Sequence, residues 1–404
     1  MVVQSLADEP FDIRLVALPG LEDVLAEEAR EAGFGETRVE PGGVHITGDW
    51  ATVWRANLTL RGASRVLVRL GSFRAMHLAQ LDKRSRKFPW SDTFGKDVPL
   101  KVEVTCRKSK IYHAGAAKER VVRAIREELG AKVSEDARLR VMVRIEDDLC
   151  TISVDTSGAP LHQRGHKLGV GKAPLRETMA ALFLRQMGYT GTEPVVDPMC
   201  GSGTIPIEAA EIAMGLLPGR SREFAFQQFV GFDAEAWEAL KKAAGGPGPR
   251  IAVRGRSAEQ HDLLHRARDS DQPAGLTSEE PRFIGSDRDA GVVRTATENA
   301  ERAGVAGLVS FRHHALSDSA LLEGSPGLVL TNPPYGGRVG NKKLLYGLYA
   351  ALGETLRQRY SGWRVGIVTS EPGLAKATGL NLKPAGPPVP HGGLKVSLWS
   401  GQVG

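Results

Sequence analysis

The stretch TNPPYGGRV, residues 331 to 339, places an amide, two prolines and a tyrosine directly after the apolar run GLVL. Proline lacks a backbone N–H and has a fixed φ, so two in succession hold an irregular backbone where the expected strand ends. Asn332 and Tyr335 would project from that point. The pattern predicts a functional site, and the alternative is a strand-end turn capped by the asparagine.

A second candidate site is VVDPMCGSGT, residues 195 to 204, which follows an expected strand and precedes the expected helix IPIEAAEIAM. Gly201 and Gly203 let the backbone approach a ligand closely, and the helix N-terminus favours a carboxylate or phosphate. The loop lacks the third glycine of a dinucleotide fingerprint and the Gly-Lys-Ser of a phosphate loop. Asp287, at the end of the next strand, is placed to accept hydrogen bonds from ribose hydroxyls. The alternative is a tight turn with an acidic cap.

The elements around these motifs fall into two patterns. From residue 12 to 155, short strands, a hairpin signal at Pro-Gly-Gly and amphipathic helices indicate a small α+β region. From about residue 179, strand–loop–helix units alternate, which predicts a doubly wound, mostly parallel sheet with an antiparallel last strand. The Gly- and Pro-rich stretch 241–282 is predicted to be a mobile insertion.

The composition is that of an ordinary globular protein, with 41% hydrophobic and 25% charged residues in a chain of 404. The net charge of +6 favours an anionic partner only weakly. No apolar run predicts a membrane span or a signal peptide, and the three isolated cysteines suggest neither disulfides nor a metal site. We therefore expect a cytoplasmic protein with no metal and no membrane partner, and a monomer is favoured.

Together the two motifs resemble those of the S-adenosylmethionine-dependent amino-methyltransferases. GGVHITGD, LHQRGHKLGVGKAPLRET and DPMCGSGTIPIEAA resemble, more narrowly, the group with an N-terminal THUMP RNA-binding domain. The likeness is greatest to the guanine-N2 domain of bacterial 23S ribosomal RNA (guanine-N2)-methyltransferase L, from about residue 12 to the end.

The resemblance implies a domain order and a set of functional residues. The expected domains are a ferredoxin-like region (1–64), a THUMP domain (65–157), a linker (158–178) and a Rossmann-like methyltransferase domain (179–404). The residues implied to hold S-adenosyl-L-methionine are Arg176, Glu177, Thr178, Asp197, Cys200, Gly201, Ser202, Gly203 and Asp287. Those implied to hold the target base are Asn332, Pro333, Pro334 and Tyr335.

One position departs from the family pattern. Relatives carry an aspartate, which meets the adenine amino group, four residues after the position of Phe311, and this chain has Ala315 there. Either Asp318 reaches the adenine from the following turn, or backbone and packing alone hold it.

Basic residues concentrate before the linker, in DKRSRK and in CRKSKIYHAGAAKERVVR. RNA phosphate contacts and ordinary solvated surface are both consistent with such runs. The candidate RNA contacts are Lys83, Arg84, Arg86, Lys87, Arg107, Lys108, Lys110, Lys118, Arg120 and Arg123.

The chemistry of an exocyclic amine explains the need for Asn-Pro-Pro-Tyr. The nitrogen lone pair is delocalised into the base, and two acceptors on its N–H groups would free it. The Asn332 amide oxygen and the Pro333 carbonyl are such acceptors, and Tyr335 can stack on the base. The same residues suit a guanine-N2 enzyme for ribosomal or transfer RNA and an N6-adenine methyltransferase. From another class, the chain could be a non-catalytic RNA-binding assembly factor.

Overall fold

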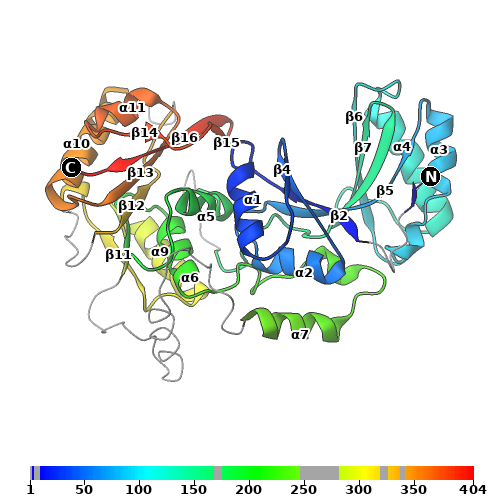
Figure 1. Cartoon of the computed structure of the whole chain (residues 1–404), viewed down its shortest axis with the longest axis horizontal. Coiled ribbons are helices and arrows are strands. Elements are labelled where there is room, and N and C mark those ends of the chain that lie inside the picture. The colour runs from blue at the N-terminus through cyan, green and yellow to red at the C-terminus, as the bar shows by residue number, and fades with distance from the viewer. Residues whose placement is uncertain (1, 4–9, 168–174, 246–281, 319–325, 337–341) are drawn as a thin grey trace. The chain divides into compact units, whose positions relative to one another are not determined.

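The computed structural model describes residues 2–3, 10–167, 175–245, 282–318, 326–336 and 342–404 (Figure 1). Its contacts divide the chain into two compact units. The described residues of Met1–Gly165 and Leu217–Gly246 form the first unit, and those of His166–Leu216 and Pro247–Gly404 form the second.

The first unit is built on a sheet with the strand order β3-β4-β2-β5-β8-β7-β6, and β1 pairs with β5. Neighbouring strands are antiparallel except β6 and β7, which are parallel. In β2, Phe11, Ile13 and Leu15 are buried and alternate with half-buried residues, the pattern of a sheet with one covered face. The strands are β1 Val2–Val3, β2 Phe11–Val16, β3 Arg38–Glu40, β4 Gly43–Gly48, β5 Arg65–Arg74, β6 Leu100–Arg107, β7 Leu139–Glu146 and β8 Leu149–Asp155.

Helices α2 and α4 of the first unit begin at polar caps. Asp49 accepts a hydrogen bond from the Thr52 N–H at the start of α2, and His113 accepts one from the Ala116 N–H at the start of α4. The helices and helical turns are α1 Glu22–Glu31, α2 Trp50–Thr59, α3 Leu78–Arg86, η1 Trp90–Asp92, α4 Ala114–Ala124, η2 Ile125–Leu129, η3 Ala225–Gln228 and α7 Ala234–Gly245.

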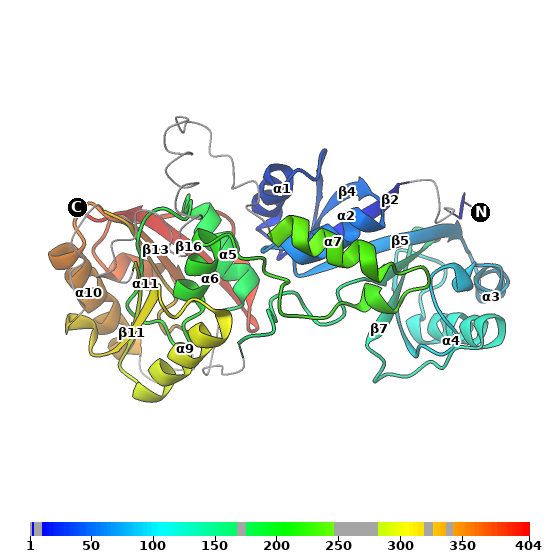
Figure 2. The same cartoon turned by 90° about the horizontal axis from the view of Figure 1, so that it is seen from below.

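Helix α7 lies beside α2, although far from it in sequence (Figure 2). The ring of Trp237 meets that of Trp54 at 6.4 Å and that of Phe226 at 5.1 Å, both edge to face. The sequence placed this segment in the methyltransferase domain, whereas its contacts belong to the first unit, and the domain limits stay a prediction. Of the predicted insertion 241–282, residues 241–245 close α7 and residues 246–281 lie outside the described residues.

The second unit is a doubly wound sheet with the strand order β11-β10-β9-β12-β13-β16-β14, and β15 pairs with β16. The first five strands are parallel and β16 is antiparallel to β13, which confirms the predicted fold class. The strands are β9 Val195–Asp197, β10 Phe283–Asp287, β11 Val309–His313, β12 Leu328–Thr331, β13 Arg364–Thr369, β14 Lys383–Pro384, β15 Val389–His391 and β16 Leu394–Gln402.

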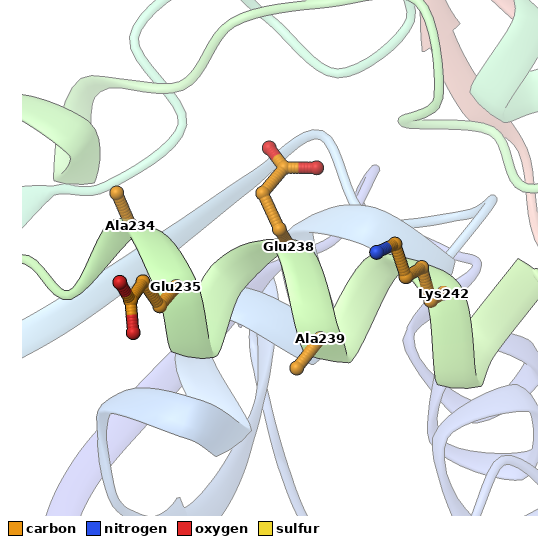
Figure 3. A pocket seen from close by; sticks show the side chains of 5 residues that line it. All are labelled: Ala234, Glu235, Glu238, Ala239 and Lys242. Atoms are coloured by element: carbon orange, nitrogen blue, oxygen red, sulfur yellow. The ribbon is translucent and has the colours of Figure 1, made fainter.

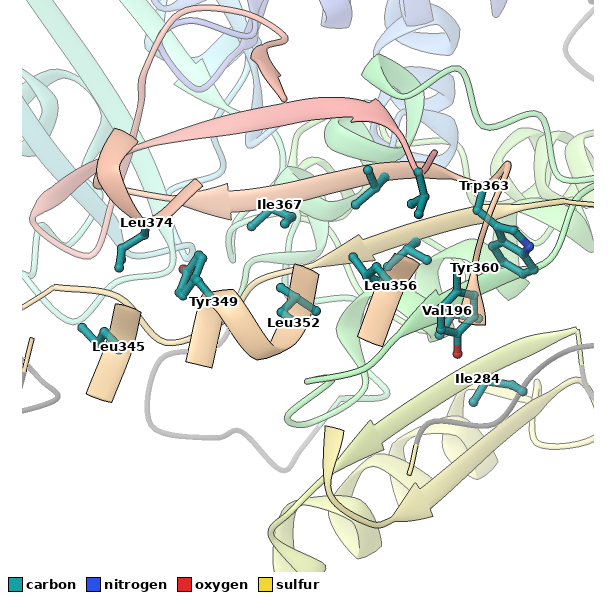
Figure 4. Packing of buried hydrophobic residues seen from close by; sticks show 13 residues of the cluster. Val196, Ile284, Leu345, Tyr349, Leu352, Leu356, Tyr360, Trp363, Ile367 and Leu374 are labelled. Carbon is teal, nitrogen blue, oxygen red and sulfur yellow. The ribbon is translucent and has the colours of Figure 1, made fainter. Parts of the chain in front are cut away.

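Helices cover both faces of this sheet, with α10 and α11 on one side and α5, α6 and α9 on the other (Figures 1 and 2). Leu345, Tyr349, Leu352 and Leu356 share one face of α10 and are buried in a cluster with Ile367 of the sheet (Figure 4). The helices and the helical turn are α5 Glu177–Gln186, α6 Thr204–Ala213, α9 Ala290–Ala303, η4 Leu316–Asp318, α10 Lys342–Arg359 and α11 Pro372–Ala377.

No helix among the described residues is both long enough and apolar enough to cross a membrane.

Candidate active site

The glycine loop connects β9 to α6. Gly201 and Gly203 have positive φ values of 51° and 83°. A Cβ at Gly203 would lie 2.6 Å from Phe311 Cζ, so only glycine fits there. A Cβ at Gly201 would have no atom of the described residues within 4 Å, apart from its chain neighbours. The loop is therefore packed at Gly203, the residue before α6, and open at Gly201.

Asp287 ties the end of β10 to this loop. Its Oδ2 accepts a hydrogen bond from the Gly201 N–H at 3.1 Å, and its Oδ1 accepts one from the Asp289 N–H at 3.0 Å. The Cys200 N–H donates to the Ser286 carbonyl at 2.9 Å. The predicted ribose-binding acid and the glycine loop thus meet at the carboxyl edge of the sheet, where open α/β sheets bind ligands.

The Asn-Pro-Pro-Tyr segment follows β12, the strand next to β9. Asn332 Oδ1 is buried and has no hydrogen-bond partner among the described residues. Pro333 is buried, Pro334 is exposed, and Tyr335 is half-buried against the cluster that contains Tyr349. A buried acceptor without a donor is costly, so the missing donor of Asn332 Oδ1 is notable within the described residues.

A hydrogen bond joins the two motifs directly. Thr331 Oγ1 donates to Asp197 Oδ1 at 2.7 Å, and the Met199 N–H donates to the same oxygen at 3.1 Å. Asp197 and Thr331 are 2% and 0% exposed, so this bond lies out of water. Burial raises the pKa of Asp197 to about 7, which the nearby charge of Asp287 reinforces and the two hydrogen bonds oppose.

Cys200 has the environment of a packed thiol rather than a nucleophile. The residue is 7% exposed. Burial, together with the carboxylates of Asp197 and Asp287, raises the pKa of its thiol well above the usual range.

The segment Arg176–Thr178 begins α5. Arg176 is exposed, whereas Glu177 is buried and forms an ion pair with Lys167 Nζ at 2.9 Å. The same ammonium donates to Thr204 Oγ1, at the start of α6, at 2.6 Å. Lys167 therefore links the start of α5 to the helix that follows the glycine loop. Sequence reasoning missed it, because its signal was one lysine in a stretch with the composition of a linker.

Three more of the predicted cofactor residues, Asp318, Ser202 and Thr178, lie in different parts of the second unit. Asp318 is exposed, and its Oδ1 accepts a hydrogen bond from the Ser317 hydroxyl at 3.1 Å. Ser202 and Thr178 are buried beside the glycine loop and in α5. The cofactor roles of these residues stay predictions, as do those of the whole set.

The predicted RNA contacts all lie in the first unit and differ in their charge balance. Arg86 forms ion pairs with Asp82, Glu127 and Glu128, and Lys118 pairs with Glu135. Arg107 lies 3.6 Å from a Glu146 oxygen. The exposed members of the set are Lys83, Lys87, Arg107, Lys108, Lys110 and Arg123, and the half-buried ones are Arg84, Arg86, Lys118 and Arg120.

Two further findings concern other kinds of site. The described residues contain no group of three or more His, Cys, Asp or Glu side chains placed to hold a metal ion. A hollow of about 450 Å³ on the first unit is lined by α7 alone, through Ala234, Glu235, Glu238, Ala239 and Lys242 (Figure 3). None of the predicted site residues lines it.

Comparisons with known protein families match three parts of the chain. Residues 12–67 match the RlmL ferredoxin-like domain, residues 76–155 match the THUMP domain, and residues 164–385 match the RMKL-like methyltransferase domain. The predicted order of a THUMP region before a methyltransferase domain is confirmed.

Two curated relatives extend over nearly the whole chain. Ribosomal RNA large subunit methyltransferase K/L of Syntrophotalea carbinolica is 35% identical over 92% of this chain. The chain spans only about half of that relative, 51% of its length. A candidate RNA methyltransferase of Synechocystis, slr0064, is 30% identical over 94% of this chain and 93% of its own length.

Solved structures agree with this grouping. SMU.472, a candidate methyltransferase crystallised with SAH, has a TM-score of 0.81 and 26% identity, covering 98% of this chain and 99% of its own. A predicted N6-adenine-specific DNA methylase from Listeria monocytogenes has a TM-score of 0.79 and 29% identity, covering 97% and 96%. The family match over residues 164–385 and the 35% identity to the Syntrophotalea protein show that this chain belongs to the RMKL-like methyltransferase family.

Proposed function

We propose that this chain transfers a methyl group from S-adenosyl-L-methionine to the exocyclic N2 amine of a guanosine in large-subunit ribosomal RNA. The observation that carries the proposal is Asn332 Oδ1, a buried acceptor without a donor among the described residues, one residue after Thr331. Because Thr331 is bonded to Asp197, the acceptor is held in fixed relation to the glycine loop. The name of the Syntrophotalea relative supports ribosomal RNA as the substrate.

The residues of the second unit suit this cofactor. The open side of Gly201, before the N-terminus of α6, suits the carboxylate of the methionine part, and Asp287 suits the ribose hydroxyls. When bound, the cofactor supplies a methyl group on a positively charged sulfur. SMU.472, which shares the fold over nearly the whole chain, was crystallised with the demethylated product SAH.

The chain's own contribution to the reaction is alignment. Asn332 Oδ1 and the Pro333 carbonyl accept the two N–H bonds of the amine, and this frees the nitrogen lone pair. The two prolines fix the direction of the carbonyl. The amine becomes acidic only as the methyl group arrives, so no strong base is needed. Orientation of this kind is worth about 7–11 kcal/mol of the barrier when it is complete.

Removing the Asn332 amide tests the mechanism. We expect Asn332→Ala to bind S-adenosylhomocysteine with wild-type affinity, because the glycine loop and Asp287 are unchanged, and to lose methyl transfer. Calorimetry with S-adenosylhomocysteine and incorporation of radioactive methyl groups into RNA measure the two effects. Wild-type turnover by this variant would remove Asn332 from the mechanism.

Mass spectrometry of nucleosides tests the substrate. We expect 23S ribosomal RNA from a strain lacking the protein to lose one N2-methylguanosine, which the wild-type chain restores and Asn332→Ala does not. Loss from transfer RNA instead would identify a transfer RNA enzyme. Loss of N6-methyladenosine would support the second candidate, which the name of the Listeria structure favours. An unchanged nucleoside profile would favour the non-catalytic assembly factor.

A further inference from the structure

The loop between β6 and α4 exposes a large aromatic ring. Tyr112 is 84% exposed, although its chain neighbour Ile111 is 4% exposed and is part of the core. For comparison, two other exposed apolar side chains of the same unit, Met76 and Leu149, are only 46% and 40% exposed. A tyrosine side chain usually buries part of its ring, so this degree of exposure leaves both ring faces open to a ligand.

The loop that carries Tyr112 is held from both sides. Asp148, in the turn between β7 and β8, accepts hydrogen bonds from the Lys110 N–H and the Ser109 hydroxyl, both at 2.8 Å. The hydrogen bond from the Lys110 N–H and, to a smaller extent, that from the Ser109 hydroxyl hold the pKa of Asp148 below its usual range. On the other side, His113 Nδ1 accepts the Ala116 N–H at 3.0 Å and caps α4. The chain on both sides of Tyr112 is therefore held in place.

Two lysines precede Tyr112 in the same loop. Lys108 and Lys110 are exposed, and no ion pair of their ammonium groups occurs among the described residues. The ammonium of Lys110 lies 3.9 Å from Met76 Sδ, so it extends over the end of β5. The contrast is with Arg86 on α3, whose guanidinium is shared among three carboxylates of its own unit. Lys108 and Lys110 therefore keep the charge that a phosphate would need, as do the other predicted RNA contacts that form no ion pair among the described residues, and they lie in the same loop as Tyr112.

We propose that Tyr112 stacks on an unpaired base of RNA while Lys108 and Lys110 contact the flanking phosphates. The inference rests on the proposed function, since it takes RNA as the partner, and it adds that the first unit binds a single-stranded segment. A ring can stack only on a base whose face is free, which a continuous duplex does not offer. The combination of one exposed ring with neighbouring lysines is the arrangement that single-stranded nucleic acid requires.

The test compares two RNA probes bound to the full chain. One is a blunt hairpin, and the other is the same hairpin with a five-nucleotide single-stranded extension that contains 2-aminopurine. We expect Tyr112→Ala to bind the extended probe about 5- to 100-fold more weakly than wild type and the blunt hairpin equally well. Tyr112→Phe keeps the ring and is the matched control, with affinity within about twofold of wild type. Stacking on the wild-type ring should also quench 2-aminopurine fluorescence, and Tyr112→Ala should abolish the quenching.

The outcomes separate this inference from the proposed function. Undiminished binding and quenching of the extended probe by Tyr112→Ala would overturn the stacking role while leaving RNA methylation intact. Wild-type protein that binds neither probe would overturn both. If Lys108→Glu with Lys110→Glu weakens binding and lowers its salt dependence, the phosphate contacts are supported. Unchanged affinity in that variant would overturn them.

Discussion

Asn332 and Asp197 carry buried oxygen atoms at the ends of neighbouring strands, and the two oxygens differ in their hydrogen bonds. Asn332 Oδ1 has no donor among the described residues, whereas Asp197 Oδ1 already has two donors. The sequence predicted Asp197 as a cofactor residue. The structure adds that its carboxylate faces Thr331, so it also positions the residue before Asn332.

The hydroxyl of Thr331 gives the first prediction. We expect Thr331→Val, which keeps the shape but removes the donor, to lower kcat about 10- to 100-fold through misplacement of Asn332. The affinity for S-adenosylhomocysteine should change far less. Steady-state kinetics and calorimetry separate the two effects, and Thr331→Ser, which restores the hydroxyl, should recover kcat. Wild-type kcat in the valine variant would show that the bond has no role in positioning.

The titration of Asp197 gives the second prediction. Its pKa is about 7 in the folded chain against 3.8 for an exposed aspartate, so the folded state binds the proton more tightly. The stability that this proton contributes is complete below pH 3.8 and is lost as the pH rises to about 7, a change of about 4 kcal/mol. Asp197→Asn keeps the acceptor and does not titrate. The unfolding free energies of both proteins are measured in urea from pH 4 to 8. The wild type should lose stability relative to Asp197→Asn as the pH rises to about 7. A difference that stays constant with pH would contradict the burial of this charge.

At the scale of elements, the sequence predicted the strand ends well because their signals are local. The glycines of the β9–α6 loop and the prolines after β12 indicate that each strand ends there, and both strands end where the sequence predicted. What the sequence could not show is which side chains meet across elements. Lys167 and Thr204 are far apart in the chain, and Thr331 meets Asp197 only because β12 pairs with β9.

The link between α5 and α6 gives the third prediction. Lys167→Met removes the charge but keeps the stem, which leaves the buried Glu177 carboxylate without its ion pair. We expect the second unit to lose about 3–5 kcal/mol of unfolding free energy. The matched double variant, Lys167→Met with Glu177→Gln, removes both charges and should recover most of that loss. Equal stabilities of the single and double variants in urea would contradict an ion pair at this position.

At the scale of the whole molecule, the chain passes between the two units more than once. It leaves the first unit after Gly165, returns after Leu216 and leaves again after Gly246. Nothing local in the sequence of 217–246 distinguishes a helix that packs on the sheet before it from one that packs elsewhere. Its aromatic residues indicate only that the segment is buried. Their partners lie in the N-terminal half of the chain, since Phe232 contacts Trp54 and Phe229 contacts Phe94.

The returning segment should therefore stabilise the N-terminal unit, and Trp237 tests this. Its ring is 4% exposed against Trp54 and Phe226, so Trp237→Ala should cost about 3–5 kcal/mol. Glu235→Gln, on the exposed side of the same helix (Figure 3), is the matched control and should change stability by less than about 0.5 kcal/mol. Peptide-resolved hydrogen exchange of the full chain distinguishes the units, because α2 and β2 should exchange faster in Trp237→Ala while β9 and β12 keep their protection. If β9 and β12 lost protection and α2 kept it, the segment would belong energetically to the methyltransferase unit, as its place in the sequence first suggested.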